Sequence, residues 1–516
     1  MLTAYPVHDI RRLEEAAIAA APNRDLMQLA AGSVASVAAE ELIRRRGLVY
    51  GARVLILVGG GNNGGDALFA GARLARRGAR VIAVSVLGRP HPAGLAALVA
   101  AGGRLVSRSN GDESDRPDQD HQPSTGEVDL EEFDLALDGI LGIGGRPGLP
   151  DPVSAMIGRL AAAGVPVIAV DLPSGVDADT GAVPSAAVRA EVTVSFGAAK
   201  LSEVIEPAKG HCGRVVRVDL GFQPDHAVTA VEVLDRDDLA RSWPYPDARS
   251  NKYSRGVVGI DAGSSEYPGA GILATHGAVY AGAGMVRFHG SDEARRVLTG
   301  ALPNVVYTEG RVQARLYGSG WGDRTDGADV ISQGLDSGLP AVVDADGLRR
   351  LPSRGLSAAW LLTPHAGELA ALLGCDRAAV EADPIGAAHR GADRTGATVL
   401  LKGSTQVVAQ PGRRSVLIAV PGPAWTAQAG SGDVLAGICA TLLAAGVPAP
   451  MAGALGASVQ AVAATSLPGP VPPQRLAEQV AVVLGRLPQR TSFEVDHGLV
   501  VDHGLGNDHG LGVDHG

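Results

Sequence analysis

The chain has 516 residues, a length that at about 100 to 200 residues per domain implies two or three domains. Its 45 Lys and Arg residues stand against 55 Asp and Glu residues, and the formal charge of -10 leaves no positive excess for holding nucleic acid. The three cysteines are too few and too scattered for a disulfide framework, which favours a reducing, cytoplasmic setting.

The first 225 residues alternate short apolar runs with Ala-rich amphipathic stretches. Their N-terminal end has no apolar stretch of signal-peptide length, so no export is predicted. The expected strands are 53–58, 134–138, 166–171 and 191–196, and the expected helices between them include 67–77 and 152–163. This βαβ order predicts a parallel sheet with its chemistry at the carboxyl ends of the strands. A polar segment, 107–127, is expected to be a solvated insertion.

Three glycine-rich turns follow these runs, and each carries an Asp. The first reads Gly-Gly-Gly-Asn-Asn-Gly-Gly-Asp at 59–66, the second begins Asp-Gly-Ile-Leu-Gly-Ile-Gly-Gly at 138–145, and the third reads Asp-Leu-Pro-Ser-Gly-Val-Asp at 171–177. Small residues let the backbone approach a ligand, and free amides at a helix start favour phosphate. The first turn matches neither the dinucleotide fingerprint nor the P-loop. On glycine content alone a plain turn is an equal alternative, and any one Asp is also compatible with a helix cap.

Together the three turns resemble the NAD(P)HX epimerase domain, over about residues 8 to 220. The resemblance implies a Rossmann-like, three-layer αβα domain within residues 1–225. It implies that a hydrated dinucleotide is bound by Asn62, Asn63, Gly64, Gly65 and Asp66, by Gly142, Ile143, Gly144, Gly145, Arg146, Pro147 and Gly148, and by Asp171. It also implies a potassium ion (K⁺) held by Asn63, Asp138 and Ser174.

The implied reaction interconverts two epimers at the hydrated carbon of the reduced nicotinamide ring, which requires proton movement and no redox change. Asp171 is the candidate catalytic acid/base, because a carboxylate at a strand end can reach a ring held by the glycine turns. Lys200 is a second candidate polar group, with a plain surface lysine as an equal alternative. Ala67 stands where the family often has Gly, a change that the start of a helix tolerates.

A second series of apolar runs predicts another α/β domain over residues 240–488. These runs are 256–261, 284–289, 315–317, 340–344, 360–362 and 398–401, and 222–245 is the expected junction. Residues 434–474 carry no charge, but Gly446, Pro448 and Pro450 interrupt them. A spanning helix needs about 20 steadily apolar residues, so we expect two buried helices here and no membrane partner.

Gln-Ala-Gly-Ser-Gly-Asp at 428–433 leads directly into an apolar helix. The amides at such a helix start form an anion site and can stabilise charge on a phosphoryl group in transfer. Asp433 is then placed to take the proton from an attacking hydroxyl. The alternative is an Asp that sits in the first helical turn only because of the helix dipole.

This element resembles the anion hole of the ribokinase-like superfamily. Other segments narrow the likeness to the ADP- or ATP-dependent NAD(P)HX dehydratase: 250–256, 269–270, 318–322, 344–346, 363–368 and 401–403. The resemblance implies a ribokinase-like αβα domain that binds the hydrated dinucleotide through Ala270, Gly322, His365 and Asp433. It implies that Lys402, Gly403, Ser404, Thr405, Gln406 and Gly432 bind the adenine nucleotide with Mg²⁺, which Glu368 would contact through water.

Two departures and one alternative qualify this match. Ser319 stands where Pro is usual, and Trp425-Thr426 replaces an Asn-Pro pair. Outside its motif, His365 would be interpreted as a packed or capping histidine.

The sequence therefore predicts a two-domain α/β repair enzyme for small molecules. The first domain equilibrates the R and S epimers of hydrated NADH or NADPH, and the second dehydrates the S form by phosphorylation and phosphate elimination. The alternative is a vitamin-precursor kinase fused to a non-catalytic binding domain. Similar proteins form homo-oligomers, which we also expect here.

Residues 491–516 end the chain with an Asp-His-Gly repeat of period six. We expect a disordered tail with no assigned metal site, since closing a site would cost it entropy.

Overall fold

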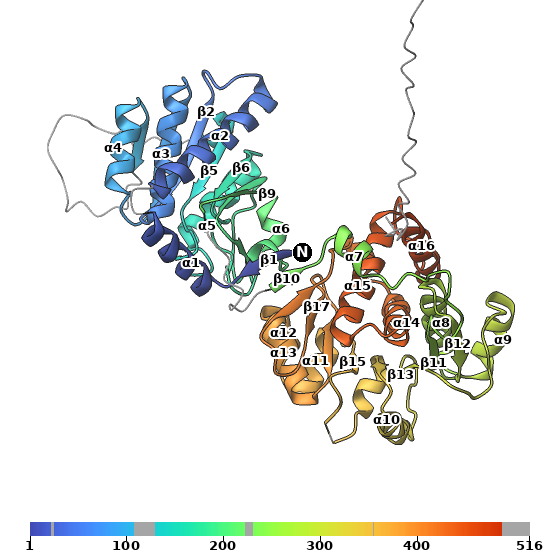
Figure 1. Cartoon of the computed structure of the whole chain (residues 1–516). Helices are drawn as coiled ribbons and strands as arrows, with labels where there is room; N and C mark the ends of the chain where they lie inside the picture. The colour runs from blue at the N-terminus through green and yellow to red at the C-terminus, as the bar shows by residue number, and fades with distance from the viewer. Residues whose placement is uncertain (22–24, 108–128, 222–230, 354, 488–516) are drawn as a thin grey trace, which may run out of the picture.

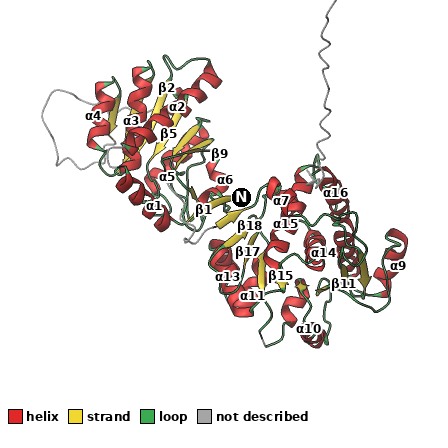
Figure 2. Cartoon of the chain, in the orientation of Figure 1, coloured by secondary structure: helices red, strands yellow, loops and turns green. Residues whose placement is uncertain are grey.

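The structure is a computed structural model, and it describes residues 1–21, 25–107, 129–221, 231–353 and 355–487. Two α/β units follow one another along the chain, each a sheet enclosed by helices (Figures 1 and 2). The Asp-His-Gly tail and, except for Ser107, the expected polar insertion lie outside the described residues.

The first unit is built on a seven-stranded parallel sheet. In spatial order its strands are β4 (Arg104–Ser107), β3 (Arg80–Leu87), β2 (Arg53–Gly59), β5 (Leu135–Gly139), β6 (Val167–Val170), β7 (Val192–Phe196) and β9 (Arg214–Val218). Its other elements are α1 (Val7–Ala20), α2 (Leu26–Arg46), α3 (Asn62–Arg76), α4 (Pro92–Ala100), η1 (Leu130–Glu132), α5 (Asp151–Ala162), η2 (Leu201–Glu203) and α6 (Lys209–Cys212).

The two faces of β2 show why this unit has three layers. Val54, Ile56 and Val58 pack in one core cluster with residues of α1 to α4, whereas Leu55 and Leu57 pack in another with residues of α5. A strand that is buried on both faces has a continuous apolar sequence, as β2 does. The strand order reverses beside β2, which has β3 on one side and β5 on the other, and a crevice opens at the carboxyl ends of such strands.

The second unit is built on an eleven-stranded mixed sheet. Its strands are, in spatial order, β12 (Met285–Phe288), β11 (Val257–Asp261), β13 (Ala314–Tyr317), β14 (Ala341–Val343), β15 (Leu361–Leu362), β16 (Thr398–Leu401), β17 (Val407–Ala409), β18 (Val416–Ile418), β10 (Val231–Val233), β1 (Leu2–Tyr5) and β8 (Ala199–Lys200). The strands from β12 to β16 are parallel, and β17 runs antiparallel to both β16 and β18.

Helices cover both faces of this sheet. One core cluster contains residues of α7 (Arg236–Ser242), α8 (Pro268–Tyr280), α9 (Asp292–Ala301), α14 (Ser431–Ala444), α15 (Ala449–Thr465) and α16 (Pro473–Arg486). The other contains residues of α10 (Gly327–Asp336), η3 (Ala345–Arg350), α11 (Ala366–Leu373), α12 (Arg377–Ala382) and α13 (Pro384–Thr395), and a short helix, η4 (Ala424–Thr426), precedes α14. The uncharged segment 434–474 covers most of α14 and all of α15, and both helices are buried, as expected.

The division between the sheets does not follow the boundary expected at residue 225. β1 and β8 precede that position, yet both belong to the second sheet: β1 pairs antiparallel with β10 and parallel with β8. β10 in turn pairs with β18. The N-terminus therefore lies where the two units meet (Figure 1). A strand as short as Leu2–Tyr5 carries no sequence signal for which sheet it joins.

One helix among the described residues, α2, is long and apolar enough to cross a membrane by length and composition. Half of its apolar window is buried inside the protein, where it packs in the core beside α3. A core helix passes the same test, so α2 is weak evidence for a span.

Candidate active sites

The first glycine-rich turn fits tightly between β2, α3 and the turn after β5. A Cβ on Gly59 would overlap the carbonyl oxygen of Ile140, and one on Gly64 would overlap the carbonyl oxygen of Gly59. Packing therefore requires glycine at both positions. α3 begins at Asn62 without a side-chain cap, so its first amides remain available to a ligand. Ala67 fits because Gly139 is opposite its methyl group.

Asp138, Ser174 and the second turn form one hydrogen-bonded cluster. Asp138 is fully buried and accepts from Ser174 Oγ at 2.6 Å and from the Ser174 N–H at 2.8 Å. Ser174 Oγ also accepts from the Leu141 N–H at 2.9 Å. The Asn63 side chain lies against Gly142, since a Cβ on Gly142 would be 3.3 Å from Asn63 Oδ1. The structure thus brings together the three residues that the resemblance assigns to K⁺.

Asp171 follows β6 at φ +70°, a left-handed conformation that is strained for any residue except glycine. One of its carboxylate oxygens, Oδ1, pairs with Lys200 Nζ at 2.8 Å, and the other, Oδ2, accepts from the Ile143 N–H at 3.3 Å. Lys200 is fully buried and also donates to Ser195 Oγ and to the Phe196 carbonyl, at 2.9 and 3.2 Å. The surface-lysine alternative is therefore wrong.

Two further carboxyl groups face this ion pair. Burial, followed by the charges of Asp171 and Glu14, raises the pKa of Asp66 to about 8, so Asp66 keeps its proton at neutral pH. The pKa of Glu14, on α1, is raised by burial and then by Asp171. Burial raises the pKa of Asp138 to about 6, against the hydrogen bonds from Ser174. A protonated carboxyl beside an ion-paired carboxylate supplies both a proton donor and a proton acceptor.

The second turn meets the site only in part. Gly142 and Ile143 touch Asn63 and Asp171, and Gly148 joins the third turn through an N–H to Gly175 carbonyl bond of 2.9 Å. In contrast, Gly144, Gly145, Arg146 and Pro147 lie exposed at the rim.

In the second unit, Asp433 lies in the first turn of α14, after Gly430 at φ +90°. No side chain caps this helix, so its first amides remain available to an anion. Burial raises the pKa of Asp433 to about 7, and the charge of Asp344 adds to this, whereas Lys402 and a hydrogen bond with Ser319 act against it. A carboxyl that titrates near neutral pH suits a general base.

Asp344, which follows β14, connects the polar groups of this site. It is buried, and its Oδ1 accepts from Lys402 Nζ and from Thr363 Oγ1, each at 2.7 Å. Its Oδ2 accepts from Ser319 Oγ at 3.0 Å. Burial lowers the pKa of Lys402, but Asp344 and then Glu368 more than offset this, so its pKa is above the ordinary value and the ammonium is charged.

Lys402 points along the start of α14, because a Cβ on Gly432 would lie 3.2 Å from its Nζ. The predicted nucleotide residues Gly403 to Gln406 form the turn between β16 and β17, with Gly403 and Ser404 exposed. Thr405 Oγ1 accepts from the Glu206 N–H of the first unit at 2.9 Å.

Ala270 and Gly322 both belong to the rim of the second site. A Cβ on Gly320 would press on the Ala270 side chain at the start of α8, and the Gly322 N–H donates to Asp346 Oδ2 at 2.9 Å. His365 caps α11: its ring Nδ1 accepts from the backbone N–H of Glu368 at 3.1 Å, and the backbone N–H of His365 donates to Glu368 Oε2 at 2.8 Å. The capping alternative therefore holds for the ring, which is still 59% exposed. The backbone of His365 pairs with that of Lys402 in a parallel β-bridge.

Sequence reasoning missed Glu14 and the central position of Asp344. Glu14 lies on an amphipathic helix, where a glutamate is ordinarily expected to face solvent. Asp344 belongs to the segment 344–346, which carried the family resemblance but gave Asp344 no role of its own. Among the described residues, no group of three or more His, Cys, Asp or Glu side chains is arranged to hold a metal ion.

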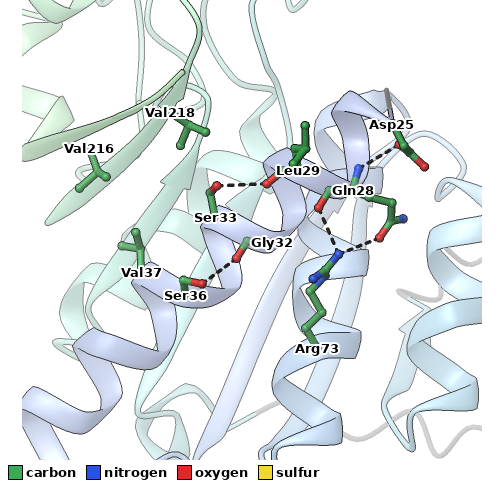
Figure 3. A pocket seen from close by; sticks show the side chains of 10 residues that line it. All are labelled: Asp25, Gln28, Leu29, Gly32, Ser33, Ser36, Val37, Arg73, Val216 and Val218. Atoms are coloured by element: carbon green, nitrogen blue, oxygen red, sulfur yellow. Dashed lines mark hydrogen bonds between the residues drawn. The ribbon is translucent and has the colours of Figure 1, made fainter. Parts of the chain in front are cut away.

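Two cavities lie away from these centres. One, of about 800 Å³, runs between α2, Arg73 and the β9 residues Val216 and Val218 (Figure 3). The other, of about 420 Å³, lies at the opposite end of α14 from Asp433, between Trp243, Tyr280 and Leu484. Neither is lined by a residue assigned above to catalysis or binding.

The fold and the two centres define a two-domain α/β protein. Its first unit has a buried Asp–Lys ion pair beside a carboxyl group of raised pKa, and its second has a buried Asp and a lysine at the uncapped start of a helix. Comparison with known proteins agrees with this division. Residues 23–202 match the family described as YjeF-related protein N-terminus, and residues 258–479 match the family described as NAD(P)H-hydrate dehydratase.

Curated relatives match most of the chain. The "Bifunctional NAD(P)H-hydrate repair enzyme Nnr" of Mycobacterium tuberculosis H37Rv is 42% identical over 455 residues, covering 86% of this chain and 89% of that protein. The Mycobacterium leprae protein of the same name is 40% identical over 458 residues, covering 86% and 90%. A solved Bacillus subtilis ADP/ATP-dependent NAD(P)H-hydrate dehydratase, co-crystallised with ATP and Mg²⁺, is 22% identical, covers 50% of this chain and 99% of that chain, and has a TM-score of 0.46.

The chain belongs to the family of bifunctional NAD(P)H-hydrate repair enzymes. It combines an NAD(P)H-hydrate epimerase domain with an NAD(P)H-hydrate dehydratase domain. The expected fold class and function are confirmed, and the vitamin-precursor kinase alternative is not supported.

Proposed function

We propose that Asp171 is the catalytic residue of the epimerase site and that Lys200 holds it in position. Their ion pair of 2.8 Å, at a strained residue on a strand end, carries this proposal. Epimerisation needs a proton donor and a proton acceptor at one carbon without net redox change. Asp171 is the acceptor, held by Lys200, and protonated Asp66 is a donor on the same site. The turns 62–66 and 142–148 bind the hydrated dinucleotide around them.

Potassium is proposed for the cluster of Asn63, Asp138 and Ser174. The donor set fits a hard cation, because it consists of amide, carboxylate and hydroxyl oxygens that lie around one turn. Asn63 Nδ2 is buried without a partner among the described residues, which leaves its amide free to turn its oxygen toward an ion. Bound there, K⁺ would supply positive charge beside the dinucleotide.

For the dehydratase, we propose that Asp433 takes the proton of the hydroxyl group on the hydrated ring. The oxygen of that hydroxyl group attacks the terminal phosphorus of ADP or ATP. The new O–P bond forms as the bond to the leaving nucleotide breaks. The first amides of α14 and Lys402 stabilise the charge on the phosphoryl group. Phosphate then leaves with the former hydroxyl oxygen, and loss of a ring proton restores NADH or NADPH.

Mg²⁺ would enter this site with the nucleotide phosphates, which supply most of its ligands. Glu368 would contact Mg²⁺ through water. Its carboxylate is held in place by His365, since one oxygen accepts from the backbone N–H of His365 and the other is 3.5 Å from His365 Nε2. Ala270, Gly322 and His365 would contact the dinucleotide, and the turn 402–406 with Gly432 the adenine nucleotide. We further propose a cytoplasmic homo-oligomer.

The test is the recovery of absorbance at the reduced-nicotinamide band from a mixture of NADHX epimers. The protein is supplied with Mg²⁺ and K⁺, and with ADP or ATP in turn. Recovery from both epimers, faster than spontaneous epimerisation and abolished by Asp433→Asn, is expected. No recovery with either nucleotide would overturn the proposal for the dehydratase site.

A further inference from the structure

Arg11, on α1, is an exposed residue at the edge of the epimerase site. Its Nη2 is 3.4 Å from the point that a Cβ on Gly144 would occupy, so the guanidinium lies against the second glycine-rich turn. Within the described part of the chain, no hydrogen bond or ion pair holds this guanidinium. Its charge and its N–H donors are therefore available beside a turn assigned above to the hydrated dinucleotide.

The packing of α1 sets the position of Arg11. The N–H of the first residue of α1 donates to Asp179 Oδ1 at 2.6 Å, which ties the helix to the loop after the third turn. Ile10 and Leu13 are buried in the core of the first unit. Arg11 and Glu14 are about one helical turn apart and share a face of α1, and Glu14 faces the ion pair of the epimerase site. The helix thus presents Arg11 to this site.

A phosphate group of the substrate finds little positive charge inside the site. The ammonium of Lys200 is paired with Asp171 at 2.8 Å. Asp138 and Glu14 add carboxyl groups. The pyrophosphate of a dinucleotide is negatively charged, and the first amides of α3 offer it donors but only a partial charge. A guanidinium supplies a full charge and paired N–H donors that match a phosphate, so Arg11 complements the substrate.

We propose that Arg11 binds a phosphate group of the hydrated dinucleotide at the epimerase site. This inference rests on the proposed function of that site, and it adds a residue of α1 to the turns 62–66 and 142–148. A ribose separates the phosphate from the reacting ring, so the contact is the same in the ground state and in the transition state. Its loss should therefore raise KM and leave kcat nearly unchanged.

The experiment measures the epimerisation of R-NADHX and of R-NADPHX by the native chain, Arg11→Met, Arg11→Lys and Arg12→Met. The full-length Asp171→Asn chain is added in excess with nucleotide, Mg²⁺ and K⁺, so that its dehydratase consumes the S epimer and epimerisation limits the rate. Spontaneous epimerisation is subtracted. Arg12→Met is the matched control, because Arg12 is the neighbouring arginine and its Nη2 is 3.5 Å from Asp9 Oδ1.

We expect Arg11→Met to raise KM about tenfold and to leave kcat within about twofold of the native value. Arg11→Lys, which keeps the charge but not the fork of donors, should recover part of the loss. Added NaCl should raise the KM of the native chain more than that of Arg11→Met, because salt screens an exposed charge. An equal rise in KM for both substrates assigns Arg11 to the pyrophosphate, and a rise confined to R-NADPHX assigns it to the 2′-phosphate.

A KM of Arg11→Met within about twofold of native for both substrates would overturn the inference. A fall in kcat at unchanged KM, or an equal rise in KM for Arg12→Met, would also overturn it. The proposed function is tested separately in the same assay. A native chain that does not exceed spontaneous epimerisation rejects the epimerase function, and retained epimerisation by Asp171→Asn alone rejects the role of Asp171. An unchanged KM in Arg11→Met, beside an active native chain and an inactive Asp171→Asn, rejects only the role of Arg11.

Discussion

Replacing Lys200 by methionine removes the ammonium that holds Asp171 while keeping a long apolar side chain at a buried position. Lys200 Nζ is fully buried and donates to three acceptors, Asp171 Oδ1, Ser195 Oγ and the Phe196 carbonyl, at 2.8, 2.9 and 3.2 Å. Removing one partner of a buried ion pair costs about 3–5 kcal/mol, within a total stability of about 5–15 kcal/mol. The variant should fold but unfold at lower temperature.

The larger effect should be on epimerisation. Asp171 loses the group that fixes its Oδ1, and a positioned acid or base contributes about 10²–10⁴-fold to a rate. We therefore expect Lys200→Met to lower the epimerase rate by about that factor. Lys200→Arg keeps the charge but not the shape of the ammonium, and it should recover only part of the rate.

The two activities of one chain make the assay internally controlled. R-NADHX alone, supplied with nucleotide, Mg²⁺ and K⁺, reports epimerisation followed by dehydration, whereas S-NADHX reports dehydration only. Lys200→Met should be slow on R and near native on S, and Lys209→Met is the matched control, because Lys209 lies on α6 and makes no described contact with Asp171. An R-epimer rate within threefold of native, after subtraction of spontaneous epimerisation, would refute the assignment.

Three other predictions follow from the same contacts. Lys402→Met should lower dehydration by about 10²–10³-fold and leave epimerisation unchanged, since Lys402 lies beside the amides of α14; equal losses in both activities would contradict this. The pKa of Asp66 is about 8 in the folded protein and near 4 in the unfolded chain, so Asp66 makes the stability fall as pH rises from 4 to 8, by at most about 1.4 kcal/mol per pH unit. In Asp66→Asn, the unfolding temperature should therefore fall less over this pH range. An unchanged pH profile in that variant would reject the burial of a neutral Asp66. Deletion of residues 1–5 removes the strand between β10 and β8, so epimerisation by the deletion variant should fall more than dehydration when R- and S-NADHX are compared.

Much of the fold and of both sites could be predicted from sequence. The apolar runs that end in glycine-rich turns located β2, β5 and β6, and the run before Asp433 located the start of α14. Turns of this kind are local: close packing around Gly59 and Gly64 restricts the residue type within a few positions of the chain. For this reason the motifs identified the elements that carry the chemistry.

The tertiary structure decided which partners these residues have. Lys200 was equally compatible with the surface until β8 was placed against β1, and Glu14 was an ordinary residue of an amphipathic helix until α1 was packed beside Asp171. Ser319 reaches Asp344 only because the loop after β13 meets the end of β14.

The sequence by itself thus determined the two α/β units, their glycine-rich turns and the family to which the chain belongs. Only the tertiary structure decided that the N-terminal strand and the Lys200 strand join the second sheet, and which ionisable groups are buried together. The physical reason is one of range: turn geometry and hydrophobic periodicity act over a few residues, whereas tertiary contacts join segments far apart in the chain, such as Glu206 and Thr405, which are 199 residues apart and hydrogen-bonded.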